Sequence, residues 1–192
     1  MNTGLHFSSL SPEWGTPQQF FNDLNEQWNF TLDPCATPQN AKCAKFFTKE
    51  QDGLKQSWAN EVVFMNPPYG DPEQPCKLVP GASLIALPVY NAKGVEVSRH
   101  AGTCNKKKCS KRGYHVSEYI PGIIDFMRKA HGEARDNKAT VVCLVPSRTD
   151  TKWFHRYALR GTVTFIEGRL KFNDGSDPAP FPSAVVVFTP KR

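Results

Sequence analysis

Apolar and polar residues follow one another along this chain in segments that predict helices and strands. Residues 16–28, TPQQFFNDLNEQW, place Phe20, Phe21, Leu24 and Trp28 at helical spacing behind a Thr-Pro start, which predicts an amphipathic helix. A short buried strand is expected in residues 30–36, FTLDPCA, and it ends at the Asp-Pro pair because proline cannot continue a ladder. A short helix over residues 38–45, a weak strand over 45–48 and a clear strand over 61–65 follow.

The second half of the chain repeats the alternation of helix and strand. Helices are expected over residues 121–134, opened by Pro121, and over 151–159, with a continuous apolar strand between them at 139–147. Two strand-like runs, 162–172 and 183–190, have no helix between them and are expected to pair as an antiparallel hairpin at one edge. The pattern predicts an α/β fold with an open, mostly parallel sheet.

Residues 71–119 show no clear period and contain one possible strand, residues 83–89. We interpret about 71–118 as an insertion within one domain that covers 1–192, since 192 residues supply one good-sized core. Hydrophobic residues make up 39% and charged residues 22%, which is typical of a globular protein. The longest apolar stretch, 84–90, is too short to span a membrane, and no signal peptide follows Met1, so a cytoplasmic protein is expected.

The net charge of +6 is concentrated in the insertion, where six basic residues and no acid lie between positions 99 and 112. Such a cluster is often only a solvated loop, but on a chain that handles nucleic acid it is a phosphate-contacting surface. Its members are Arg99, Lys106, Lys107, Lys108, Lys111 and Arg112. The six cysteines, with no export signal, are expected to be reduced thiols or metal ligands.

Polar residues stand where several predicted strands end. Asp33, Asn66 and the loop 146–150 all follow strands, and ligands of open α/β sheets bind outside the carboxyl ends of the strands. These segments are therefore expected to converge on one site.

The stretch EVVFMNPPYG, residues 61–70, is either an ordinary turn or a catalytic loop. Prolines at 67 and 68 stiffen it, and they leave the Asn66 side-chain oxygen and the Pro67 carbonyl as acceptors without strand partners. Two such acceptors suit an amine conjugated to an aromatic ring, because accepting its N–H bonds favours the tetrahedral nitrogen that attacks. Tyr69 offers a ring on which a base can stack.

NPPY after an apolar strand resembles the catalytic motif of S-adenosylmethionine-dependent methyltransferases that modify amino groups, above all the adenine-N6 DNA methyltransferases. The resemblance assigns catalysis to Asn66, Pro67, Pro68 and Tyr69. Thr16 and Pro17 in EWGTPQQFFNDL resemble a helix start that contacts the cofactor, with a plain helix cap as the alternative. FTLDPCA resembles the first-strand motif, with Asp33, Pro34 and Cys35 at the amino-acid end of the cofactor, although no Gly-x-Gly follows.

The order of motifs most closely resembles the phage-type adenine-N6 enzymes, outside about residues 71–113. This resemblance implies a Rossmann-like methyltransferase with a seven-stranded sheet whose last strand is reversed, and a phage or prophage protein in a bacterial host cell. Glu50, Asp52 and Asn66 are further cofactor candidates, and Arg148 is a DNA candidate. The alternatives are a surface acid for Glu50, a turn-forming residue for Asp52 and an internal salt bridge for Arg148.

A duplex hides the adenine amine, so such an enzyme must extrude the base, and the basic insertion is expected to grip the flanking DNA. The insertion also holds Cys76, Cys104, Cys109 and His115, which predict either a structural zinc site or unpaired thiols. We expect methyl transfer to adenine N6 in duplex DNA. The alternatives are methylation of an amine or amide in RNA or protein, and a nucleic-acid-binding module without catalysis.

Overall fold

The structure is a computed structural model that describes residues 14–76, 87–90, 96–100, 116 and 118–190. The chain divides into two compact units, residues 1–71 with 122–192 and residues 72–121. The predicted insertion, 71–118, covers most of the second unit, and its assignment as part of one methyltransferase domain stays a prediction.

The larger unit contains a mixed, open sheet of six strands within the described residues. These are β1 (Leu32–Asp33), β2 (Lys45–Phe46), β3 (Val62–Met65), β6 (Thr140–Pro146), β7 (Thr162–Phe165) and β8 (Ser183–Phe188), in the order β2-β1-β3-β6-β8-β7. β2, β1, β3 and β6 are parallel, whereas β8 pairs antiparallel with both β6 and β7. The expected antiparallel pairing of the last two strands is confirmed, but the reversed strand lies inside the sheet, between β6 and β7.

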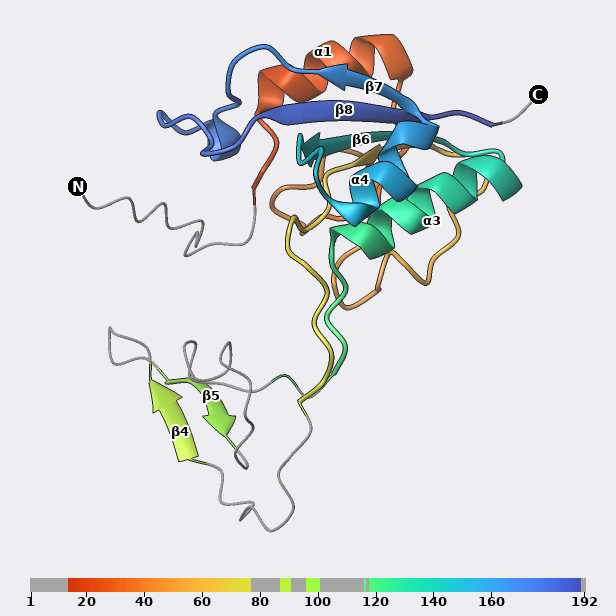
Figure 1. The fold of residues 1–192 in the computed structure, drawn as a ribbon. Helices are drawn as coiled ribbons and strands as arrows, with labels where there is room; N and C mark the ends of the chain where they lie inside the picture. Colours follow the sequence, from red (N-terminus) through yellow and green to blue (C-terminus); the bar gives the residue numbers. More distant parts are fainter. Residues whose placement is uncertain (1–13, 77–86, 91–95, 101–115, 117, 191–192) are drawn as a thin grey trace. The chain divides into compact units, whose positions relative to one another are not determined.

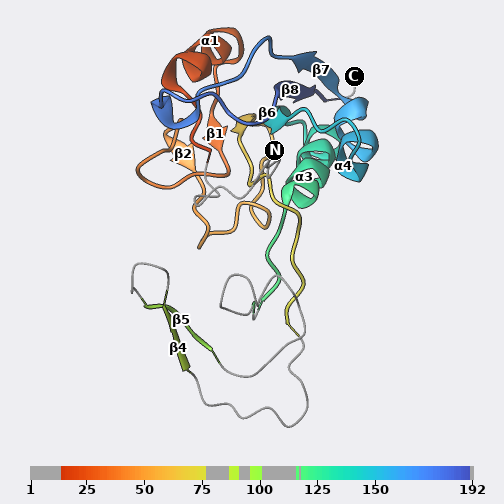
Figure 2. The ribbon, with the colours of Figure 1, turned by 60° about the vertical axis from the view of Figure 1, so that its left-hand side comes forward.

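Helices cover both faces of this sheet (Figure 1). α1 (Gln18–Trp28) lies on one face, and α3 (Ile123–Asp136) and α4 (Lys152–Arg156) lie on the other. A 3-10 turn η1 (Ala158–Arg160) continues α4, and a second one, η2 (Phe172–Asp174), precedes β8. Figure 2 shows α3 and α4 side by side. Their alternation with the strands is the α/β arrangement that the sequence pattern predicts.

Apolar side chains from α1 and the central strands form the core on the α1 face. Phe21 of α1 contacts Phe64 of β3 edge-on, with ring centroids 5.1 Å apart, and both rings also contact Phe30. β6 is buried along nearly its whole length, as a continuous apolar run in a parallel sheet predicts. None of the helices in the described residues has the length and apolar character needed to cross a membrane.

Trp58 joins the segment between β2 and β3 to α3. Its ring nitrogen donates a hydrogen bond to the Gly53 carbonyl at 3.0 Å, and its backbone N–H donates to Glu133 of α3 at 3.2 Å. Glu133 is also paired with Lys129 at 2.6 Å, and the Trp58 side chain is fully buried. These contacts fix the turn around Gly53, which lies beside the end of β1.

Two sequence predictions of local structure are wrong, and one strand was not predicted. Residues 38–45 form turns rather than a helix, because the Asn40 side chain accepts the Thr37 N–H and the Thr37 carbonyl closes short turns. The run 162–172 is a strand only to Phe165, since the chain then turns through Gly168, whose φ is +74°. The strand β5 (Glu96–His100), which pairs antiparallel with β4 (Leu87–Tyr90), was not predicted.

Candidate active site

The ends of three adjacent strands meet at one edge of the sheet. β1 ends at Asp33, β3 ends before Asn66, and β6 ends before Ser147. Because β1, β3 and β6 are neighbours and parallel, their carboxyl ends lie side by side. The structure therefore brings together the Asp33, Asn66 and 146–150 segments, as the sequence predicts.

Two acceptors from the segment before α1 hold the Asn66 side chain. Its amide nitrogen donates hydrogen bonds to the Trp14 carbonyl at 2.5 Å and to the Thr16 hydroxyl at 3.0 Å. A backbone carbonyl can only accept, so the amide nitrogen must face Trp14 and the side-chain oxygen must face the other way. The buried Thr16 hydroxyl thus contributes to the orientation of Asn66.

The Asn66 oxygen, expected to lack a strand partner, has a partner within its own loop. That oxygen accepts a hydrogen bond from the Tyr69 hydroxyl at 2.7 Å. An amide oxygen has two acceptor sites, so one remains for a second donor. Within the described part of the chain, the carbonyl of Pro67, a buried residue, receives no hydrogen bond.

Tyr69 is itself buried, with 7% of its surface exposed. Its ring contacts Phe172 and Phe181 edge-on, at centroid distances of 6.2 and 5.6 Å, and its hydroxyl also lies 3.3 Å from the Leu144 carbonyl. Burial raises the pKa of the Tyr69 phenol well above its ordinary value, so the hydroxyl stays protonated and donates. Tyr69 therefore belongs to the wall of the site in this structure, whereas Pro68 is exposed.

The segment that closes this wall was not predicted from the sequence. Trp14 contacts Phe172 and Phe181 edge-on, and Asn173 exchanges hydrogen bonds with Gly15, both at 2.7 Å. A Cβ at Gly15 would stand 2.5 Å from the Asn173 side-chain oxygen, so any larger residue there would displace the Asn173 side chain. Gly15 and Asn173 are 158 positions apart, and no rule of helix or strand spacing links residues at that separation. The segments Trp14-Gly15 and Phe172-Asn173-Asp174 nevertheless contain the aromatic, glycine and asparagine residues that form this contact.

Asp33 lies at the end of β1 with only 4% of its surface exposed. Its two carboxylate oxygens accept the backbone N–H groups of Cys35 at 3.2 Å and Lys42 at 3.1 Å. Burial nevertheless raises the pKa of Asp33, because these hydrogen bonds offset the desolvation only in part. Burial also raises the pKa of the neighbouring Cys35 thiol, which is therefore an uncharged group at neutral pH.

The turn at residues 52–54 lies directly against the residue that follows Asp33. A Cβ at Gly53 would stand 2.2 Å from the Pro34 carbonyl, so only glycine allows this approach. Asp52, at φ 52°, accepts the Leu54 N–H at 3.2 Å and pairs with Lys55 at 3.0 Å, which is the turn-forming role of the alternative interpretation. Glu50 is exposed, and a hydrogen bond from Thr48 lowers its pKa.

The remaining candidate residues belong to other segments of the chain. Arg148 is exposed after β6, and its carbonyl accepts the Thr151 hydroxyl at 2.7 Å. Arg99 is in β5 of the smaller unit, and Lys106, Lys107, Lys108, Lys111 and Arg112 lie outside the described residues. The Cys76 sulfur accepts the Val116 N–H at 3.3 Å, whereas Cys104, Cys109 and His115 also lie outside. The described residues contain no group of metal-ligating side chains.

Comparison with known proteins identifies the family. Residues 7–182 match the family described as DNA N-6-adenine-methyltransferase (Dam), and the chain belongs to this family. It is 25% identical over 167 residues to the DNA N-6-adenine-methyltransferase of Escherichia phage T1, covering 85% of this chain and 58% of that protein. No solved structure matches the chain.

Two further relatives match shorter stretches. The DNA N-6-adenine-methyltransferase of Haemophilus phage HP1 is 39% identical over 61 residues, 31% of this chain and 35% of that protein. A putative methyltransferase, YfdM, of Escherichia coli is 34% identical over 67 residues, 31% of this chain and 74% of that protein. The chain thus spans 58% and 35% of the length of the two phage relatives.

Proposed function

We propose that this protein transfers the methyl group of S-adenosylmethionine to the exocyclic N6 amine of adenine in DNA, with the target base extruded from the duplex. Membership of the Dam family and the names of its phage relatives support this reaction and substrate. The observation that carries the proposal is the fixed amide of Asn66 beside Pro67 at the carboxyl end of β3, next to the buried carboxylate of Asp33.

The residues at the end of β1 fit this methyl donor. S-adenosylmethionine supplies a methyl group on a sulfonium sulfur and also carries an ammonium group, so it is a cationic ligand. Asp33 is a buried carboxylate that forms no salt bridge with the described residues, and its raised pKa reports the cost of burying that charge. An ammonium group near Asp33 would offset this cost. Thr16, Pro17, Pro34, Cys35, Glu50, Asp52 and Asn66 are the other candidate contacts.

Asn66 and Pro67 would hold the adenine amine. The second acceptor site of the Asn66 oxygen and the Pro67 carbonyl each take one N–H of the amine, which directs the nitrogen lone pair at the methyl carbon. The carbon–nitrogen bond forms as the carbon–sulfur bond breaks, and the sulfur keeps the electron pair. The nitrogen then releases a proton to water, so no strong base is required at the outset.

Stacking of the base on Tyr69 requires a rearrangement. Only 7% of the Tyr69 surface is exposed, so the ring or the Phe172 and Phe181 side chains that contact it must move before a base can stack on it. Movement of the ring would release the hydrogen bond that occupies the Asn66 oxygen. Entry of the base is thus proposed to exchange one donor, the Tyr69 hydroxyl, for another, the adenine amine.

The smaller unit and its flanks are proposed to contact DNA through Arg99, Lys106, Lys107, Lys108, Lys111 and Arg112, with Arg148 at the edge of the sheet. The strand order, with a reversed strand between β6 and β7, supports a Rossmann-like methyltransferase. A structural zinc site at Cys76, Cys104, Cys109 and His115, a seventh strand, a cytoplasmic location and phage or prophage origin remain predictions.

Calorimetry with S-adenosylmethionine, followed by methyl transfer to duplex DNA, RNA and protein in parallel, tests the function. We expect donor binding and transfer to adenine-containing duplex alone. Donor binding with transfer only to RNA or protein would contradict the substrate. DNA binding without donor binding would contradict catalysis and favour a nucleic-acid-binding module.

A further inference from the structure

A basic groove lies on the larger unit between α3 and the α4–η1 segment. Its first part is a hollow of about 500 Å³, and the basic residues lining it are Arg128, His131, Arg135, Arg156 and Arg160. An adjoining hollow of about 400 Å³ shares His131, Arg135 and Arg160 and continues to Pro190. Among the described residues, neither hollow is lined by an aspartate or glutamate.

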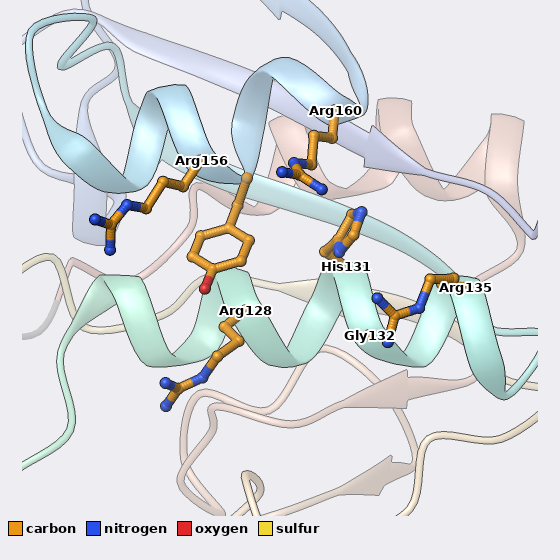
Figure 3. Close-up of a pocket in the computed structure, with 7 residues that line it drawn as sticks. Arg128, His131, Gly132, Arg135, Arg156 and Arg160 are labelled. Carbon is orange, nitrogen blue, oxygen red and sulfur yellow. The ribbon is translucent and has the colours of Figure 1, made fainter.

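The basic side chains form two rows with helical spacing. Arg128, His131 and Arg135 are separated by three and four positions, so they share one face of α3. Arg156 and Arg160 are four positions apart at the end of α4 and in η1. In Figure 3, one row extends from each helical segment, and the Arg160 side chain points toward His131. The groove therefore has a cationic wall on each side.

The two rows differ in whether their arginines form ion pairs. Arg128 is paired with Asp125 at 2.7 Å, and Arg135 with Asp136 at 2.6 Å, while both arginine side chains are more than half exposed. A guanidinium has five donors, so each can hold a carboxylate and a second anion together. Arg156 and Arg160 are exposed and form no ion pair with the described residues. They are the cations most available to a ligand.

The form of the groove favours a chain of anions over a single ion. The two connected hollows make an elongated surface. Each guanidinium group can donate two parallel hydrogen bonds to two oxygens of one phosphate. The helix α3, which carries one of the two rows, begins beside the segment that follows Tyr69, because the Ile123 N–H donates to the Gly70 carbonyl at 3.0 Å. Arg128 and Arg135 lie about 8 and 18 Å from Ile123 along the axis of α3. The longer distance corresponds to roughly five nucleotides of one DNA strand.

We propose that this groove binds phosphodiester groups of the DNA that flanks the target base, as a second contact surface separate from the basic insertion. This inference rests on the proposed function, which supplies DNA as the polyanion. Contacts of this kind position the duplex and read no sequence. The groove therefore contributes affinity for any duplex, with or without a recognition site.

Neutralising the unpaired row tests the proposal. Affinity for a mixed-sequence duplex of 24 base pairs, chosen for the assay, is measured by fluorescence anisotropy over a range of salt concentrations. For Arg156→Gln with Arg160→Gln, we expect roughly tenfold weaker binding at low salt and a log–log salt slope smaller by about 1.8, since each lost phosphate contact removes about 0.9. Arg156→Lys with Arg160→Lys keeps both charges and is expected to keep most of the slope.

The matched control is Lys49→Gln with Lys138→Gln, which removes two exposed charges that line neither hollow. Equal slopes for the control and the groove variant would overturn the inference while leaving the proposed function intact. Inorganic triphosphate that binds the groove while duplex affinity stays independent of Arg156 and Arg160 would replace DNA with a free phosphate ligand. A wild-type protein that binds no duplex would overturn both proposals, and normal thermal melting of each variant excludes misfolding.

Discussion

The edge of the sheet at Asn66 and the groove along α3 are both polar, but they are built in opposite ways. At the edge, a few polar side chains are buried or partly buried, and hydrogen bonds fix their orientation. The amide of Asn66, for example, is fixed by Trp14 and Thr16. In the groove, several like charges are exposed, and two of them are paired with a carboxylate of their own helix. Fixed dipoles suit bond-making, which depends on geometry, whereas exposed like charges suit binding to a polyanion.

The largest expected effect is at the fixed edge. Asn66→Ala removes an acceptor of the reacting amine, and we expect the rate of methyl transfer to fall by about 10²- to 10³-fold, the usual cost of one group that stabilises a transition state. The affinity for duplex is expected to stay within about twofold, because DNA binding depends mainly on phosphate contacts. Single-turnover kinetics and anisotropy measure the two quantities, and undiminished transfer would refute the role of Asn66.

Alanine substitutions at two glycines test how tightly the edge of the sheet and the groove are packed. Gly53→Ala places a methyl group against the Pro34 carbonyl, so we expect the free energy of unfolding to fall by about 3 kcal/mol. Gly132→Ala, in the groove on α3, meets nothing within 4 Å and is expected to raise it by up to about 1 kcal/mol through helix propensity. Urea denaturation gives both values. Similar small effects at the two sites would show that the turn at Gly53 is not tightly packed.

Thr16 distinguishes orientation of Asn66 from contact with the methyl donor. Thr16→Val removes the hydroxyl that accepts from the Asn66 amide, and we expect kcat to fall about tenfold, the equivalent of one lost hydrogen bond of about 1.4 kcal/mol. A role in orienting Asn66 alone predicts an unchanged KM for S-adenosylmethionine and restoration of kcat by Thr16→Ser. A raised KM with unchanged kcat would instead assign Thr16 to the donor site.

The smallest effect expected is on the pH dependence of stability. Because burial raises the pKa of Asp33 above 3.8, the unfolded chain releases this proton at a lower pH than the folded protein. This carboxyl therefore lowers the free energy of unfolding as the pH rises from about 4 through its folded pKa. Asp33→Asn lacks that decline, apart from a constant offset for its altered hydrogen bonds. In urea denaturation between about pH 4 and 7, the free energy of unfolding of Asp33→Asn should rise relative to that of the wild type as the pH increases. A difference that does not change with pH would contradict a raised pKa of Asp33.

The arrangement of strand ends could be predicted from the sequence because the end of each strand has a local sequence signal. Apolar runs ended by Asp-Pro and Asn-Pro place Asp33 and Asn66 at strand ends, and parallel neighbours bring those ends together. The sequence did not predict that Tyr69 is buried against Phe172 and Phe181, or that Gly15 exchanges hydrogen bonds with Asn173, because these contacts join segments far apart in the chain. It likewise missed the groove, since the two rows become one surface only when α3 and α4 pack together.

Identification of the methylated product tests the central claim most directly. Wild-type protein is incubated with S-adenosylmethionine that carries an isotopically labelled methyl group and with adenine-containing duplex, and the DNA is digested to nucleosides for mass spectrometry. We expect the label in N6-methyldeoxyadenosine. Label in a methylated cytosine, or a protein that binds donor and duplex yet leaves the DNA unlabelled, would contradict the account.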